Sequence, residues 1–93
     1  MSLNAEHLAS LIGEQVVIDL AASFVYLGKL KSVDAGFLVL TDADVHDLRD
    51  SDSTREIYVL NSVRDGIRRN RKEVRVRWEA VLSISRITDV VDH

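Results

Sequence analysis

The sequence predicts a mainly β domain, with an N-terminal α-helix, five antiparallel strands forming a small barrel, and a helix inserted between the third and fourth strands. Segments rich in β-branched and aromatic residues, many of them alternating between apolar and polar positions, are typical of short strands. Two other segments carry apolar residues at helical spacing. The 93 residues suffice for one modest core, so we expect residues 1–93 to form a single domain.

The first predicted helix lies in "SLNAEHLASLIG". Leu8 and Leu11 stand at helical spacing, Asn4 is a suitable N-cap, and Gly13 is a typical C-terminal stop. These signals predict a short amphipathic α-helix before the first strand.

Three strands are predicted next, at about 15–21, 23–33 and 37–46. The second and third are joined by the tight turn Asp34-Ala35-Gly36. An acidic loop without apolar periodicity follows them.

The second predicted helix spans about 54–65, inside an insertion of about 53–68. Ser53 and Glu56 have the spacing of a capping box. We expect its apolar stripe to close over its own domain, with a neighbouring subunit or a partner as the alternative cover. The stripe consists of Ile57, Leu60, Val63 and Ile67.

Two alternating strands, in "EVRVRW" and "AVLSISRITDVV", complete the chain and are joined by a short turn at Glu79-Ala80. Five strands in meander order can bend into a small barrel, which leaves the first and last strands as unpaired edges. Because such edges attract another chain, we expect a homo-oligomer built by strand pairing.

The composition excludes several kinds of protein. The chain has no cysteine, so disulfides, thiolate metal sites and cysteine nucleophiles are ruled out. The longest apolar runs are a few residues, far below the ~20 that a membrane helix needs. We expect a soluble, cytoplasmic protein that does not enter a membrane.

The charge is divided unevenly along the chain. Residues 1–63 hold ten acids and four bases, whereas residues 64–93 hold eight bases and five acids. A dense basic run can be a solvated face or a contact for a polyanion such as a nucleic acid. The bases that we assign to phosphate attraction are Arg68, Arg69, Arg71 and Lys72.

Two segments resemble the Sm/LSm family of RNA-associated proteins. Residues 28–43 match its Gly-x-Leu, Asp turn, apolar triplet and Asp-Ala, and residues 76–85 are similar to its Ile-Arg-Gly segment. The resemblance implies a strongly bent five-stranded barrel whose subunits close into a ring, with RNA bases bound near the pore.

The resemblance also implies binding residues. Asp34 and Arg77 match the family's base-holding aspartate and arginine, whereas Phe37 stands in the place of the asparagine and Trp78 in that of the glycine. Phenylalanine can stack on a base but cannot read its edge. We expect Phe37 or Trp78, beside Arg77, to hold a single strand by stacking with low sequence selectivity.

Each of these residues has an alternative interpretation. Asp34 can cap its own turn, or it can pair with Arg77 without any ligand. Phe37 can begin a core strand, and Trp78 can anchor a subunit contact.

Other chemistry has little support in the sequence. Asp42, Asp44 and His46 alternate and could share one side of a strand, but three ligands on one strand rarely complete a metal shell. No phosphate loop or nucleophile motif is present, so we expect no enzyme activity, no cofactor and no metal.

The sequence therefore predicts an Sm-like homo-oligomeric ring that binds single-stranded RNA with low selectivity. Its partners would be copies of itself and single-stranded RNA. The alternative is an oligomeric scaffold or protein-interaction module with the same fold that has lost the RNA site.

Overall fold

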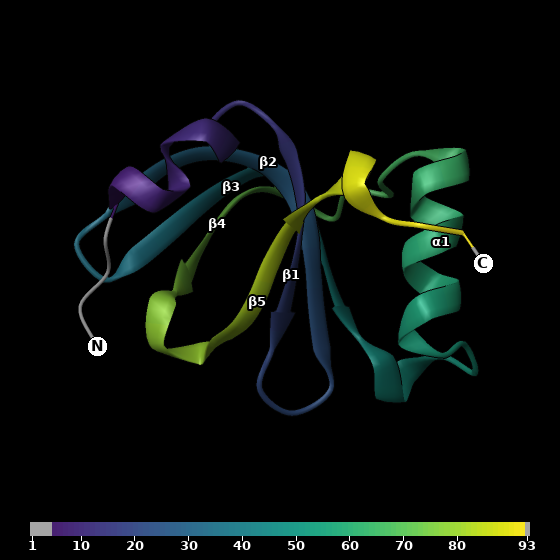
Figure 1. Ribbon diagram of the computed structural model, residues 1–93. Helices are drawn as coiled ribbons and strands as arrows, with labels where there is room; N and C mark the ends of the chain where they lie inside the picture. The colour runs from purple at the N-terminus through teal and green to yellow at the C-terminus, as the bar shows by residue number, and fades with distance from the viewer. Residues whose placement is uncertain (1–4, 93) are drawn as a thin grey trace.

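The computed structural model describes residues 5–92, and their side chains from Leu8 onward. Five antiparallel strands form one sheet in the order β4-β3-β2-β1-β5. Figure 1 shows this sheet bent strongly, with α1 at one end and the N-terminal turn at the other. The main elements are the 3₁₀ turn η1 (Ala5–Leu11), β1 (Gln15–Leu20), β2 (Phe24–Asp34), β3 (Phe37–Asp47), α1 (Arg55–Asp65), β4 (Arg71–Arg77) and β5 (Val81–Arg86).

The order of the elements and the helix between the third and fourth strands are confirmed. The predicted edges were partly wrong, because β1 lies inside the sheet and pairs with both β2 and β5. The two edge strands are β4 and β5. The fifth strand also ends at Arg86 instead of continuing to residue 91, since the short 3₁₀ turn η4 (Ile87–Asp89) follows it.

The bend is concentrated in β2 and β3, which are 11 residues long each. Their pairing shifts register in two places, and Asp42 at one of them has a positive φ of 49°. An extra residue on one strand bends and twists it, so these bulges curl the sheet. Gly28 lies at the same place, where an added Cβ would come within 3.1 Å of Ala43.

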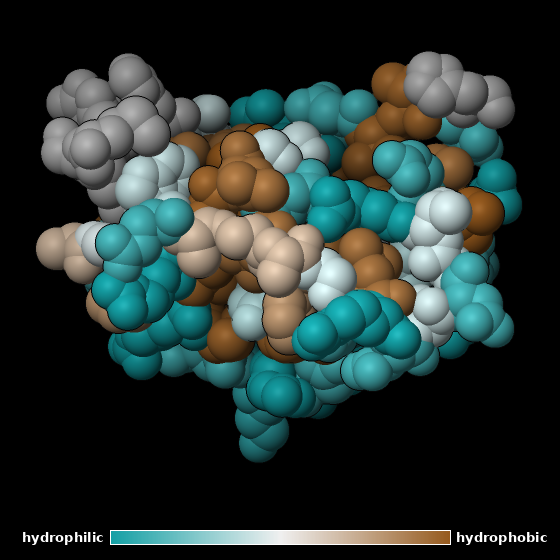
Figure 2. All heavy atoms as spheres, turned by 90° about the horizontal axis from the view of Figure 1, so that it is seen from below, coloured by the Kyte–Doolittle hydropathy of each residue, from teal (hydrophilic) through white to brown (hydrophobic). Residues whose placement is uncertain are grey.

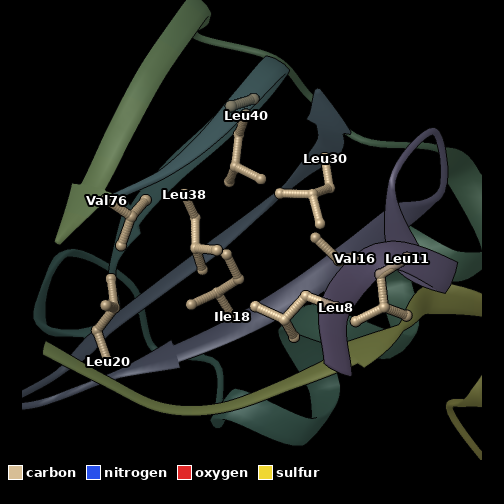
Figure 3. Packing of buried hydrophobic residues seen from close by; sticks show 10 residues of the cluster. Leu8, Leu11, Val16, Ile18, Leu20, Leu30, Leu38, Leu40 and Val76 are labelled. Carbon is tan, nitrogen blue, oxygen red and sulfur yellow. The ribbon is translucent and has the colours of Figure 1, made fainter. Parts of the chain in front are cut away.

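The concave face of the sheet holds the larger core. Alternate residues of β1 and β3 point into it, among them Ile18, Leu38 and Leu40, which are fully buried. Leu8 and Leu11 of η1 close the open side of this core, as Figure 3 shows.

On the convex face, α1 covers the part that β1 and β2 form. A second cluster there consists of Val17, Val25, Leu27, Val59 and Ile87. Because both faces of β1 are covered, its consecutive residues 16, 17 and 18 are all buried.

The predicted N-terminal α-helix is instead the seven-residue 3₁₀ turn η1. So short a segment gains little from α-helical propagation, and a 3₁₀ turn is enough to place its two leucines on the core. Gly13 ends the segment as expected, with φ of 91° and an N–H that donates to the Leu30 carbonyl at 2.7 Å. The predicted cap, Asn4, lies outside the described residues.

The position of α1 was predicted well, but its cap and its buried face were not. Thr54, and not Ser53, is the N-cap: its hydroxyl accepts from the Ile57 amide at 3.3 Å. The helix buries Val59 and Ser62, whereas Ile57 and Val63 of the predicted stripe are exposed. Between residues 5 and 92, no helix has the length and apolar character needed to cross a membrane.

Candidate functional site

Three predicted binding residues lie side by side at one end of the sheet. Asp34 of β2 pairs with Phe37 of β3, and Phe37 pairs with Arg77 of β4. Directly opposed residues in antiparallel strands point to the same face. The structure therefore brings together a carboxylate, an aromatic ring that is 38% exposed, and a guanidinium.

Two turns fix this arrangement. Gly36 has φ of 82°, which glycine adopts without strain, and this lets β2 return as β3 after Asp34. The Trp78 amide donates to the Gly36 carbonyl at 2.8 Å, which ties the turn after β4 to the turn after β2.

The charged members of this site are exposed. Arg77 forms an ion pair with Glu79, and both side chains are about two-thirds exposed, so this pair contributes little stability and can exchange for a ligand. Within residues 5–92, Asp34 makes neither the turn-capping hydrogen bond nor the Arg77 pair that the sequence left open. Both groups therefore remain available at the surface.

Trp78 follows Arg77 directly but is not part of this row of paired strand residues. It belongs to the short 3₁₀ turn η3 (Trp78–Ala80), is partly buried and packs against the concave core. Its ring therefore contributes to the packing of its own subunit.

The basic run lies at the opposite end of β4. Arg71 and Arg77 are six positions apart, which is about 20 Å along a strand. Arg69 pairs with Asp42 at 2.5 Å, and Arg71 donates to the Asn70 carbonyl. Lys72 is exposed, and Arg68 lines a polar pocket beside α1. A ligand that used both regions would have to follow β4.

The Asp42, Asp44 and His46 pattern is not a metal site. The bulge at Asp42 breaks the alternation, and Asp44 is only 2% exposed. Asp44 accepts hydrogen bonds from the Tyr58 hydroxyl and from Asn70 Nδ2, while the His46 ring stacks on Tyr58 at 3.7 Å. Among the residues that the structure describes, no three His, Cys, Asp or Glu side chains are grouped to hold a metal.

This polar cluster changes the titration of Tyr58. Burial raises the pKa of the Tyr58 hydroxyl, and its hydrogen bond to the Asp44 carboxylate raises the pKa further. Tyr58 therefore remains a neutral donor to Asp44 at physiological pH.

The sequence predicted that the last strand is an edge, as β5 is, but did not identify the side chains that lie along the two edge strands. Leu82 of β5 is 70% exposed at a position where the pairing with β1 shifts register. Hydrophobic side chains also reach the surface on the face shown in Figure 2. No pattern in the sequence distinguishes Leu82 from the inward residues of an alternating strand.

A pocket with a volume of about 290 Å³ lies along β4. Three consecutive residues of β4 line it, as expected for a pocket along a strand's unpaired edge. Its lining is formed by Leu20, Ala21, Phe24, Tyr26, Arg75, Val76, Arg77 and Ala80.

Solved structures with the same fold include archaeal Sm proteins. The Pyrobaculum aerophilum SmAP1 heptamer is 30% identical, with a TM-score of 0.58 over 87% of this chain and 88% of that chain. The Pyrococcus abyssii Sm protein in complex with a uridine heptamer is 20% identical, with a TM-score of 0.59 over 87% and 93%. A chain of the NatC complex bound to CoA is 21% identical, with a TM-score of 0.55 over 90% and 86%.

No protein-family model matches the sequence, and no curated protein matches it significantly. The 30% identity to archaeal Sm proteins extends over most of both chains, and the strand order and bend agree with the fold that the sequence motifs implied. The chain belongs to the Sm/LSm-like fold family.

Proposed function

We propose that this protein assembles into a homo-oligomeric ring and that the ring binds single-stranded RNA with low sequence selectivity. The observation that carries the assembly is the pair of unpaired edges, β4 and β5, at the two ends of the sheet. Identical copies can continue the sheet by pairing β5 of one subunit with β4 of the next, and a repeated rotation closes a ring.

The side chains along these edges are complementary. Leu82 projects from β5, and the pocket beside β4 has an apolar lining that includes Leu20, Phe24 and Tyr26. Inserting the leucine of one copy into the pocket of the next removes apolar surface from water on both sides. The archaeal SmAP1 relative is a heptamer, which supports assembly of this kind.

The proposed RNA site is the Asp34, Phe37 and Arg77 row. Phe37 provides a face for stacking, Arg77 provides charge and a planar donor, and Asp34 can accept from a base edge. Support comes from the Pyrococcus abyssii Sm protein, which was solved with a uridine heptamer. Phenylalanine cannot select a base by hydrogen bonds, so low selectivity follows. The basic residues 68–72 would attract phosphates from the far end of β4.

Titration of labelled oligo(U) and oligo(A) at two salt concentrations tests the RNA site. We expect similar affinities for both, weaker binding at the higher salt, and a loss of about tenfold for Arg77→Ala, because one charged contact and one stacking partner disappear. Lys29→Ala, which removes an exposed cation from β2, is the matched control and should bind as the parent does.

A second candidate function is a protein-interaction module of the same fold. The similar chain in the NatC complex belongs to a multiprotein assembly, and Phe37 replaces the residue that would select a base. A ring that binds neither oligonucleotide at low salt would favour this second function over the first.

A further inference from the structure

A groove on the convex face has no role in the function proposed so far. It lies between α1, the C-terminal residues 90–92, and strands β1 and β5, and its volume is about 400 Å³. Figure 1 shows the C-terminal segment passing from β5 to α1. The apolar part of the lining includes Val17, Val59, Leu60 and Val91.

The groove is acidic. Asp19, Glu56 and Asp92 contribute three carboxylates to its lining, against the single guanidinium of Arg55. Arg55 Nε lies 3.2 Å from Asp19 Oδ1, but neither atom makes a well-directed hydrogen bond. Asp92 is held from the helix side by Arg64 at 2.9 Å. A cation that enters the groove therefore meets Glu56, which forms no ion pair within residues 8–92, beside Asp19 and Asp92, each of which already pairs with one arginine.

The groove opens toward the unpaired edge of β5. Ser85 of that strand lines it, and Ser83 donates a hydrogen bond to Asp19 Oδ2 at 2.8 Å. Ser83 pairs with Asp19 and Ser85 with Val17, so both serines lie on the face that α1 covers. A strand added beside β5 would continue this face next to the groove.

The strand that the proposed ring adds there is β4 of a second copy, and its convex face is basic. Val74 and Val76 pack toward the concave core, so the alternate residues Arg71, Arg75 and Arg77 point to the convex side. Between residues 5 and 92, the Arg75 side chain has no ion pair or hydrogen bond, although it is exposed on an ordered strand. Glu73, the acid on the same face, is bound by Lys31 of its own subunit.

We propose that the groove beside α1 is the second half of the subunit contact and receives Arg75 of the neighbouring copy. The inference rests on the proposed ring. If Leu82 enters the pocket beside the neighbour's β4, antiparallel pairing places Ser83 level with that neighbour's Arg75. Asp19 is then two strands away, about 10 Å, a gap that an arginine and an aspartate side chain together span.

The chemistry of arginine fits this groove. Its methylene stem can lie against the apolar wall that α1 and Val91 form, while its guanidinium reaches the carboxylates. The inserted helix thus gives each subunit an acidic receptor for the neighbour's basic strand, in addition to the backbone pairing.

Double-mutant cycles on ring assembly test the contact. Sedimentation or mass photometry over a dilution series gives the concentration of half-assembly. We expect Arg75→Ala to raise the concentration of half-assembly about tenfold. In a chain that already carries Arg75→Ala, Asp19→Asn or Glu56→Gln should raise this concentration little further, because the arginine and the acid take part in the same interaction. Asp52→Asn, on an exposed loop, is the carboxylate control and should act independently of Arg75.

The outcomes separate this inference from the ring proposal. The groove contact would be overturned if the parent forms a ring and Arg75→Ala leaves its assembly unchanged. The same holds if Arg75 shows no coupling to either acid, and in both cases the ring proposal would remain. A parent that stays monomeric would overturn both.

A covalent measurement tests the same geometry. The chain has no cysteine, so Glu56→Cys mixed with Arg75→Cys can form a defined link between two copies. We expect a cross-linked dimer from the mixture and much less from either variant alone. An intact ring without this heterodimer would contradict the groove contact.

Discussion

Asp44 is the buried residue that attaches the inserted helix to the sheet. The carboxylate is 2% exposed and accepts from the Tyr58 hydroxyl on α1 and from Asn70 before β4. Asn70 also bonds the backbone of Val45 through both its amide nitrogen and its amide oxygen. A buried carboxylate requires such donors, so this cluster holds three segments in one arrangement.

Removing one donor measures this attachment. Tyr58→Phe leaves Asp44 with a single side-chain donor, and we expect it to lower the free energy of unfolding by about 1–3 kcal/mol in urea denaturation. The control is Tyr26→Phe, at the only other tyrosine, whose ring packs edge-to-face on Phe24. Equal effects for the two variants would contradict a special role for the Asp44 bond.

The same bond predicts a pH dependence. The pKa of Tyr58 is raised in the folded protein, so the neutral hydroxyl stabilises the fold fully below the unfolded-state pKa of about 10. This stabilisation is lost as pH rises through the folded-state pKa. The parent should therefore lose stability above about pH 10 more steeply than Tyr58→Phe does.

The sequence predicted site residues correctly where those residues lie close together along one hairpin. Asp34 and Phe37 flank one turn, and the motif at residues 28–43, which spans this hairpin, could assign them. Asp44, Tyr58 and Asn70 meet only because α1 folds back over the convex face. No local pattern links residues separated by 14 and 26 positions.

At the scale of elements, α1 shows what helical spacing can and cannot determine. Its apolar residues are distributed around most of the helix, with Val59 toward the sheet and Ile57 toward solvent. Several stripes then fit the sequence equally well, and tertiary packing selects one of them. The strands were predicted more accurately, because alternation of apolar and polar residues along segments as long as 11 residues indicates a strand and not a helix.

The observed cap of α1 yields a direct test. Thr54→Ala removes the side chain that accepts from the Ile57 amide, and we expect a loss of about 1 kcal/mol in unfolding free energy. Ser53→Ala removes the predicted but unused cap and should change stability little. The reverse ranking would support the capping box that the sequence suggested.

At the scale of the whole molecule, the bent sheet does not pair its own two edges. Its concave core is closed by η1 and its convex face by α1, yet β4 and β5 keep unpaired edges. The motif resemblance predicted the bend of the sheet, and the small size of the chain predicted that its edges need protection. It could not indicate that β1 lies inside the sheet, because that pairing joins residues far apart in the chain.

Leu82 provides the sharpest test of how those edges are protected. Its side chain is 70% exposed in the isolated chain, so Leu82→Asp should leave the fold of the subunit intact. If the leucine is buried between copies, the same change removes about 1.5–3 kcal/mol per contact, because the apolar surface of the leucine is no longer withdrawn from water. We expect light scattering at micromolar concentration to report a ring for the parent and mainly monomer for Leu82→Asp.

The matched control is Ile12→Asp, which places the same charge at an exposed apolar residue that is not part of β5. That variant should assemble as the parent does. Circular dichroism should give both variants the spectrum of the parent, so that a loss of assembly cannot be attributed to unfolding. If Leu82→Asp forms a ring as stable as that of the parent, the edges pair without this side chain. Backbone pairing and the groove beside α1 would then be the contacts that hold the ring together.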